Sequence, residues 1–355
     1  MRRVQDIHVR ATEALIAPRA LKEALPSDRK VIDTVADARQ TIRAILTGHD
    51  RRLICVVGPC SIHDPKAAID YASRLAKLAP RIADEIFITM RVYFEKPRTT
   101  IGWKGLINDP HMDESCDMQQ GLRIARELLL EINGLGLPCG TELLDPITPQ
   151  YIADLISWAA IGARTTESQT HREMASGLSM PVGFKNTTDG NLQIAIDAIE
   201  SARHPHSFLG ITQEGMTAIV RTAGNPDTHV VLRGGSKSPN YDAASIAECE
   251  RMLTAAKLEP RVMVDCSHAQ TNKDYTKQPS VLAALVEQIR LGSGAILGAM
   301  VESNLNAGRQ NLLKDRAAMT YGVSITDPCI DWQTTEDCLL AAALALGARQ
   351  RSFKS

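Results

Sequence analysis

Eight side chains that can bind a metal ion or an anion occur at regular points along this chain. Each lies at the end of a short apolar run or one or two residues beyond it, and they are Cys60, Arg91, Glu142, Arg164, Lys185, Arg233, His268 and Glu302. In a closed parallel barrel the carboxyl ends of all strands meet on one face, where the active sites of barrel enzymes lie. The pattern therefore predicts an enzyme.

A thiol, an imidazole and two carboxylates form the first chemical set. Cys60, His268 and Glu302 end three of the runs, and Asp327 follows in the segment YGVSITDPC. Thiolate, imidazole and carboxylate together suit a divalent metal such as Mn, Fe, Co or Zn. Taken singly, Cys60 and His268 would more often be a buried structural cysteine and a core histidine. Their shared position at strand ends favours a metal site.

The second set is cationic, and its members are Arg91, Lys96, Arg98, Arg164, Lys185 and Arg233. A lone basic residue after a strand is usually a solvated loop residue, but six around one mouth would repel one another unless anions lay between them. Arginine binds phosphate and carboxylate through two parallel hydrogen bonds. The expected ligands therefore carry several negative charges, as two phosphorylated molecules would. Glu142 either tunes a lysine, orients a water or is an ion-pair partner.

Other binding chemistries find little support. The glycines of GLGLPCG lack the spacing of a dinucleotide site, and no phosphate-binding loop ending in Gly-Lys-Ser/Thr occurs. An aromatic content of 4% leaves few stacking surfaces for nucleic acid. We expect His204, His206 and His229 at the surface or in a hairpin rather than at a metal.

The elements that must position these residues alternate between strand and helix periodicity eight times. The expected strands are 53–57, 85–92, 139–143, 160–163, 182–185, 230–233, 262–266 and 295–301. The expected helices are 66–78, 121–132, 149–158, 168–178, 192–202, 246–257, 281–291 and 336–348. This count favours an α/β fold of the (β/α)8 TIM barrel type over an open sheet. The loop of about 95–115 is long for such a fold, which is typical of a functional loop.

Two segments lie outside this repeat. Residues 1–45 are expected to form an N-terminal extension with helical pieces at 12–16, 20–24 and 31–46, and residues 46–355 the catalytic barrel. The segment FLGITQEGMTAIV predicts an inserted β-hairpin within about 206–226 that turns at Gln213, Glu214 and Gly215.

Composition and charge exclude several partner classes. The net charge of -1, from 40 basic and 41 acidic residues, gives no overall attraction to nucleic acid or to a membrane. No stretch approaches the roughly 18 apolar residues of a membrane span, and the N-terminus lacks the apolar core of a secretory signal. The eight cysteines form no CxxC pair. We therefore expect a cytoplasmic protein with reduced thiols.

Motifs along nearly the whole chain resemble those of a known family. They are GPCSIHDP (58–65), MRVYFEKPRTTIGWKGLINDPHM (90–112), IGARTTESQTHREM (161–174), GFKN (183–186), LRGG (232–235), VDCSH (264–268), MVES (300–303) and SITDPC (324–329). Together they are similar to type I 3-deoxy-D-arabino-heptulosonate 7-phosphate (DAHP) synthases of the feedback-regulated group. The resemblance implies condensation of phosphoenolpyruvate with erythrose 4-phosphate and water, which releases phosphate in the first step of the shikimate pathway.

Carried over position by position, the resemblance implies roles for both chemical sets. The implied metal ligands are Cys60, His268, Glu302 and Asp327. The implied phosphoenolpyruvate site is Arg91, Lys96, Arg164, Lys185 and Arg233, assisted by Glu142 and the backbone of Ala163. Arg98 and Thr99 would hold erythrose 4-phosphate, and Lys96 and His268 are the candidates for proton transfer. The implied metal polarises the aldehyde while C3 of phosphoenolpyruvate attacks it, and water then adds at C2 before phosphate leaves.

The resemblance also implies an aromatic amino acid effector, bound by the extension and the hairpin, and a homodimer or homotetramer. The implied effector residues are Asp145, Pro149, Gln150, Leu178, Ser179, Phe208, Gly210 and Val220. Phenylalanine-sensitive relatives carry serine at the position of Gly210, whereas tyrosine-sensitive ones carry glycine, so the resemblance favours tyrosine. Alternatively, Gly210 serves only the backbone of the hairpin.

Two other functions remain open. A Schiff-base aldolase could use Lys185 as its nucleophile, and borohydride would then trap the intermediate while chelators had no effect. A non-catalytic sensor of aromatic amino acids would need neither the metal set nor the cationic set.

Overall fold

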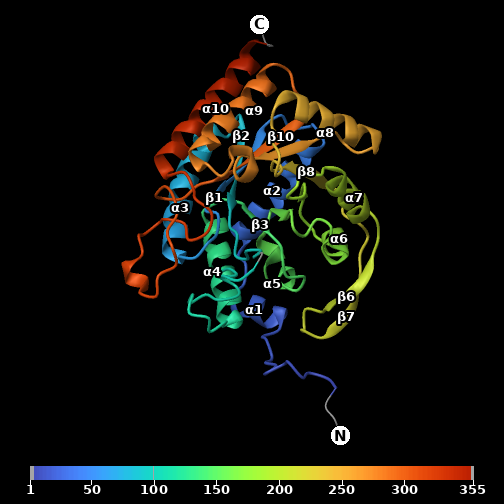
Figure 1. The fold of residues 1–355 in the computed structure, drawn as a ribbon, viewed down its shortest axis with the longest axis vertical. Coiled ribbons are helices and arrows are strands. Elements are labelled where there is room, and N and C mark those ends of the chain that lie inside the picture. The colour runs from blue at the N-terminus through green and yellow to red at the C-terminus, as the bar shows by residue number, and fades with distance from the viewer. Residues whose placement is uncertain (1–3, 99, 353–355) are drawn as a thin grey trace.

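Eight parallel strands close into a barrel in this computed structural model, which describes residues 4–98 and 100–352, without the side chains of 349–352. The order around the barrel is β1-β10-β9-β8-β5-β4-β3-β2. The strands are β1 (Leu53–Gly58), β2 (Ile86–Arg91), β3 (Cys139–Glu142), β4 (Trp158–Ile161), β5 (Val182–Lys185), β8 (Thr228–Leu232), β9 (Val262–Asp265) and β10 (Ile296–Glu302). The predicted (β/α)8 fold is confirmed, because helices alternate with these strands around the barrel (Figure 1).

The helices follow the predicted order with shifted ends. They are α1 (Pro18–Ala24), α2 (Arg29–Leu46), α3 (Pro65–Leu78), α4 (Met118–Gly134), α5 (Pro149–Ile152), α6 (Gln169–Ser176), α7 (Gln193–Ala202), α8 (Ala243–Ala255), α9 (Gln278–Arg290) and α10 (Trp332–Ser352). Local chemistry sets several starts: the Asp64 carboxylate accepts from the backbone N–H groups of Lys66 and Ala67, and Pro65 occupies the first helical turn.

Three predictions of local structure were wrong. Residues 12–16 are not helical. The helix expected over 149–158 is a single turn followed by the 3-10 turn Ala153–Leu155, because Trp158 already begins β4. His229 lies inside the barrel near the start of β8 rather than at the surface, with its Nε2 accepting from Trp158 Nε1 at 3.0 Å.

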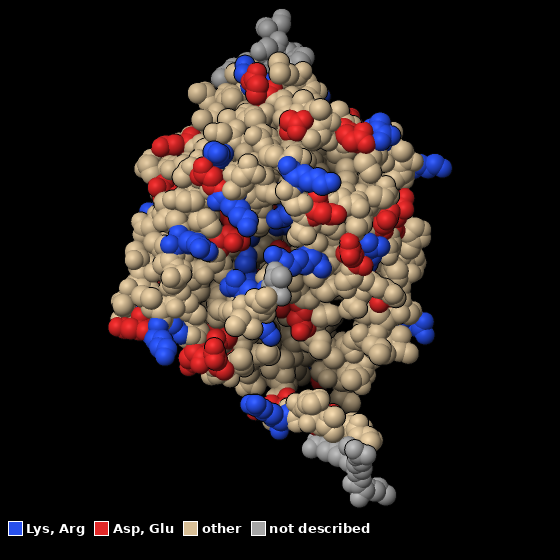
Figure 2. All heavy atoms as spheres, viewed as in Figure 1, with Lys and Arg blue, Asp and Glu red and all other residues tan. Residues whose placement is uncertain are grey.

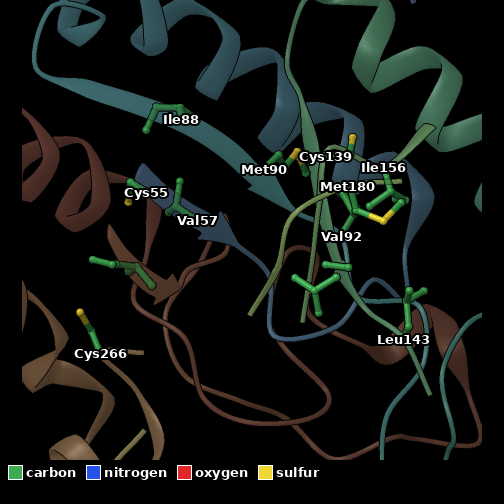
Figure 3. Packing of buried hydrophobic residues seen from close by; sticks show 14 of the residues in the cluster. Cys55, Val57, Ile88, Met90, Val92, Cys139, Leu143, Ile156, Met180 and Cys266 are labelled. Carbon is green, nitrogen blue, oxygen red and sulfur yellow. The ribbon is translucent and has the colours of Figure 1, made fainter. Parts of the chain in front are cut away.

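Two apolar layers hold the barrel. The outer layer joins the strands to the surrounding helices, and Figure 3 shows Cys55, Val57 and Met90 among its buried side chains. The inner layer fills the barrel and includes Trp158 and Met263. It also includes Ile42, Ile45 and Leu46 of α2, so this helix packs on the inner layer and covers one end of it.

The inserted hairpin and the N-terminal extension meet at one end of the molecule (Figure 1). Strands β6 (Ser207–Ile211) and β7 (Thr217–Arg221) pair antiparallel, as predicted, and Gly215 in the turn has a φ of 78°. The backbone N–H of Arg19 in α1 donates to the Gln213 carbonyl at 2.8 Å, and Lys22 Nζ donates to Gln213 Oε1 at 2.9 Å. The tip of the hairpin is therefore tied to α1.

Candidate active site

Three of the four predicted metal ligands come together at the mouth of the barrel. Cys60 lies two residues beyond β1, Glu302 ends β10 and Asp327 lies in the loop before α10. One donor atom from each lies within 4.8 Å of the other two. Cys60 and Glu302 are buried, whereas Asp327 lies at the exposed rim. His268 is not part of this group and stays a prediction as a ligand.

Two predicted cations border this group. Arg91 is fully buried and donates to Glu302 Oε1 at 3.0 Å and to the carbonyls of Pro59 and Cys60 at 3.1 and 3.2 Å. Lys96 Nζ lies 3.1 Å from both the carbonyl oxygen and the Sγ of Cys60. These residues are far apart in the sequence but lie close together in space, because β1 neighbours both β2 and β10 in the barrel.

These neighbours shift the proton affinities of the group. Burial, assisted by Glu302, raises the pKa of the Cys60 thiol to about 11, although Lys96 and Arg91 oppose the shift. Partial burial would raise the pKa of the Asp327 carboxyl, but Lys96 and His268 outweigh it and lower this pKa below its ordinary value. Burial would likewise lower the pKa of Lys96, but the acidic groups around it raise the value. The arrangement keeps Asp327 anionic and Lys96 cationic.

A second buried centre is Asp265, which the sequence analysis did not select. It ends β9 with no exposed surface and accepts from Lys185 Nζ at 2.9 Å. His268 Nδ1 lies 3.0 Å from the same carboxylate and 2.6 Å from Ser267 Oγ. Because Nδ1 is engaged, Nε2 is the His268 atom left for a metal or a proton. An acidic residue that ends a barrel strand was the signal in the sequence that could have identified Asp265.

Arg233 and Arg164 lie on the neighbouring strand ends. Arg233 directly follows β8, and burial lowers its pKa while Asp265 opposes this and Arg164 adds to it. Its backbone N–H donates to Asn186 Oδ1 at 2.9 Å, so the amide that follows Lys185 fixes the start of the Arg233 loop. Arg164 is exposed three residues beyond β4, further from its strand than predicted, because β4 ends at Ile161.

Glu142 ends β3 and is buried beside the next strand end. A Cβ at Gly162 would overlap the Glu142 carboxylate, so a glycine is needed where the chain passes this side chain. Ala163, predicted to assist through its backbone, follows directly and is partly buried. Glu142 therefore lies between the β2 and β4 strand ends.

The long loop after β2 folds back on itself. Lys96 N–H donates to the Lys104 carbonyl at 2.8 Å, and Arg98 Nε donates to the Trp103 carbonyl at 2.7 Å. Gly105 has a φ of 115° and presses against the Phe94 carbonyl, where a Cβ would overlap it. Arg98 is exposed, and Thr99 lies outside the described residues.

The predicted effector residues lie on four segments. On the hairpin, Phe208 pairs with Val220 and Gly210 with Ala218, and a Cβ on Gly210 would lie 2.8 Å from Val220 Cγ2. Gln150 of α5 accepts from Gln213 Nε2 at 2.8 Å, which joins α5 to the hairpin tip. The remaining four are Asp145 and Ser179, which are exposed, Leu178, which packs on the outer apolar layer, and Pro149, which is buried.

Lysine and arginine side chains gather near the centre of the face drawn in Figure 2. The chain as a whole is almost neutral, with a net charge of -1. A local excess of positive charge at the mouth of the barrel favours anionic ligands. Among the described residues, no helix has both the length and the apolar content that a membrane span needs.

Comparisons with known proteins identify the family of this chain. The model of the DAHP synthetase I family matches residues 30–340. The Tyr-sensitive phospho-2-dehydro-3-deoxyheptonate aldolase of Escherichia coli (strain K12) is 55% identical over 336 residues, which cover 95% of this chain and 94% of that protein. The Phe-sensitive enzyme of the same organism is 55% identical over 345 residues, covering 97% and 98%.

A solved structure shares the fold. The phospho-2-dehydro-3-deoxyheptonate aldolase from Francisella tularensis SCHU S4 superimposes with a TM-score of 0.93 at 50% sequence identity. The match covers 96% of this chain and 99% of the other. The chain therefore belongs to the DAHP synthetase I family and is a 3-deoxy-7-phosphoheptulonate synthase, the enzyme of the first step of the shikimate pathway.

Proposed function

We propose that the mouth of the barrel binds phosphoenolpyruvate among Arg91, Lys96, Lys185, Arg164 and Arg233, next to a divalent metal and to erythrose 4-phosphate. The observation that carries this proposal is the contact between the two chemical sets. Lys96 and Arg91 both hydrogen-bond to residues of the Cys60, Glu302 and Asp327 group. Cations on one side and acidic donors on the other suit an anionic substrate beside a metal.

The donor chemistry fits a divalent metal. One thiol and two carboxylates within 4.8 Å of one another are a mixed sulfur and oxygen set, which Mn, Fe, Co and Zn accept. His268 Nε2 is the proposed fourth donor, because its Nδ1 is engaged by Asp265. With a pKa of about 11, Cys60 is a thiol at neutral pH, so metal binding would release its proton. When bound, such an ion would supply Lewis-acid polarisation of the aldehyde.

The residues of the chain supply orientation and protons. The arginines and lysines hold both anionic substrates in one arrangement, which converts a bimolecular encounter into an oriented one. Lys96 Nζ is proposed as a proton donor, because its raised pKa keeps it charged at the edge of the metal group. Glu142, buried between the two strand ends, is proposed to orient the water that adds at C2. Arg98 and Thr99 are proposed to hold erythrose 4-phosphate.

The Schiff-base alternative has less support. Lys185 Nζ donates to the buried Asp265 carboxylate at 2.9 Å, so the atom that would attack a carbonyl is already engaged. The non-catalytic alternative also has less support, because both chemical sets that it does not need are assembled.

The effector site and the association of copies are two further parts of the proposal. We propose that tyrosine binds between α1, α5 and the hairpin, where Gly210 leaves open the space that a side chain would take beside Val220. We also propose that two or four copies of the chain associate in the cytoplasm. Leu209, Met216 and Ile219 on the hairpin are 88%, 66% and 63% exposed, which supports an apolar contact between copies.

The test is a phosphate-release assay with purified protein, both substrates and Mn²⁺. We expect turnover only with both substrates, loss of activity with EDTA, rescue by Mn²⁺ or Co²⁺ and inhibition by tyrosine. Activity that persists in EDTA, together with trapping by borohydride, would instead establish the Schiff-base chemistry of Lys185. Inhibition by phenylalanine alone would contradict the proposed effector.

A further inference from the structure

Three of the cations at the mouth of the barrel lie around one aromatic ring. The guanidinium carbon of Arg91 is 3.5 Å from the centre of the Tyr93 ring. The amino groups of Lys96 and Lys185 are 5.6 and 5.9 Å from the same centre. All three distances lie within the roughly 6 Å over which a cation is attracted to an aromatic face. Arg91 ends β2, Lys96 lies in the loop that follows it, and Lys185 ends β5.

Tyr93 lies between the apolar interior and the charged mouth. The residue is fully buried and belongs to the inner layer with Trp158 and Met300. Among the described residues, its hydroxyl has no hydrogen-bond partner, and neither has Nη1 of Arg91. Burial raises the pKa of the Tyr93 phenol, and although Arg91 opposes this, the phenol stays neutral. Tyr93 therefore offers its neighbours an aromatic face and no counter-charge.

Carboxylates compensate only part of this positive charge. In the described part of the chain, Arg91 pairs with Glu302 and Lys185 pairs with Asp265, whereas Lys96 forms no ion pair. The two buried cations, Arg91 and Lys185, and the partly buried Lys96 repel one another. An aromatic face lowers this repulsive energy by attracting each cation, and it leaves their charge available to a ligand. A third carboxylate would instead compete with an anionic substrate for the same donors.

We propose that Tyr93 is a positioning residue for phosphoenolpyruvate, whose ring holds Arg91, Lys96 and Lys185 as a preassembled anion pocket. This inference rests on the proposed assignment of these three cations to phosphoenolpyruvate. The proposal assigns the effect to the ring, because the three cations lie near its centre, whereas no described residue hydrogen-bonds to the hydroxyl.

The experiment compares Tyr93→Phe, which keeps the ring, with Tyr93→Leu, which removes it. Calorimetric titration of Mn²⁺-loaded protein with phosphoenolpyruvate alone measures affinity without turnover, and steady-state kinetics give KM for each substrate. We expect Tyr93→Phe to bind within about twofold of the parent, and Tyr93→Leu to bind about tenfold or more weakly, the range of one or more desolvated cation–π contacts. The KM for erythrose 4-phosphate stays within about twofold in both.

Tyr71→Leu is the matched control for loss of a buried ring. Tyr71 is also fully buried, but its ring packs edge-on against Trp332 with centroids 5.5 Å apart, outside the barrel interior. We expect this variant to lower the melting temperature without changing the affinity for phosphoenolpyruvate. If Tyr93→Leu does not fold, Tyr93→Met removes the ring with an unbranched side chain that adapts more readily to the space, and it replaces Tyr93→Leu in the comparison.

The outcomes separate the two levels of the proposal. If the parent protein fails to bind phosphoenolpyruvate, the proposed site itself is wrong. If the parent binds and the ringless Tyr93 variant binds equally well, only the role of Tyr93 is overturned. Equal loss in Tyr93→Phe and Tyr93→Leu would assign the effect to the hydroxyl and would also overturn the proposal.

Discussion

Asp265 connects the two chemical sets of the candidate site at the scale of single residues. Its carboxylate holds Lys185 of the cationic set and His268 of the proposed metal set. Burial would raise the pKa of this carboxyl, but Lys185 and His268 lower it well below its ordinary value. Asp265 therefore joins the cationic set to the proposed metal set through one carboxylate.

His229 is a buried residue whose protonation the fold opposes. Its Nε2 accepts from Trp158, so Nδ1 must carry the proton that is shared with the Val230 carbonyl. Burial lowers the pKa of His229 from 6.5 to about 4. In the unfolded chain the imidazole takes up a proton below about pH 6.5, whereas in the folded chain it stays neutral down to about pH 4.

We therefore expect His229 to make the protein less stable as the pH falls from about 6.5 to about 4. The loss is roughly 3 kcal/mol, from about 1.4 kcal/mol for each pKa unit. The glutamine of His229→Gln cannot titrate, so the free energy of unfolding of this variant should decrease less over the same pH range. Urea denaturation of both proteins at several pH values measures this difference. Parallel pH dependences would show that His229 does not titrate as a buried neutral group.

The residues of the site were more predictable than their contacts. A short apolar run that ends in a polar residue is a clear pattern in the sequence. It correctly placed six residues at or just beyond strand ends: Cys60, Arg91, Glu142, Lys185, Arg233 and Glu302. Asp265 and Tyr93 were missed. Asp265 lies close to a stronger candidate, His268, in the segment VDCSH. Tyr93 looks like an ordinary core aromatic in the sequence, and only the fold brings three cations near its ring.

Among the elements, the hairpin β6–β7 was predictable and the ends of several helices were not. Alternating residues around Gln213, Glu214 and Gly215 predict a hairpin from local sequence alone. The segment 149–158 has helical spacing, but a strand must begin at Trp158 to pair with β3 and β5, and this pairing overrides the local preference.

Gly210 tests the regulatory role of the hairpin. A side chain at this position would lie 2.8 Å from Val220 Cγ2, so Gly210→Ser must displace Val220 or occupy the space beside it. We expect tyrosine inhibition to weaken at least about tenfold, as one added group in a packed pocket can cause, and activity without effector to stay unchanged. Activity assays with tyrosine and phenylalanine titrated separately measure both effects.

Thr217→Ala is the control for this change, because Thr217 lies at an exposed position on the same hairpin and is not among the proposed effector residues. It should leave inhibition unaltered. Tyrosine inhibition of Gly210→Ser equal to that of the parent would mean that the glycine serves only the backbone of the hairpin.

The whole molecule joins a closed barrel to an extension and a hairpin at one end. Eight alternations of strand and helix in the sequence predicted a closed barrel, since helices that join parallel strands cover the sheet and both faces of the sheet are buried. Periodicity could not predict how α1, α5 and the hairpin tip meet. This meeting depends on side-chain hydrogen bonds such as Lys22 to Gln213 and Gln213 to Gln150, between residues far apart in the sequence.

The central claim is that Cys60, Glu302 and Asp327, with His268, hold the metal on which catalysis depends. Titration of metal-free protein with Co²⁺ tests it most directly, because cobalt bound to a thiolate gives a charge-transfer absorption that reports the sulfur ligand itself. Cys60→Ser is compared with Cys116→Ser, a cysteine that is exposed in the loop before α4. We predict that Cys116→Ser keeps the absorption and the activity. Cys60→Ser should lose the absorption and bind the ion more weakly, by at least the roughly 10–100-fold that loss of an outer partner causes. An unchanged cobalt spectrum in Cys60→Ser, or full activity in metal-free buffer, would contradict the account.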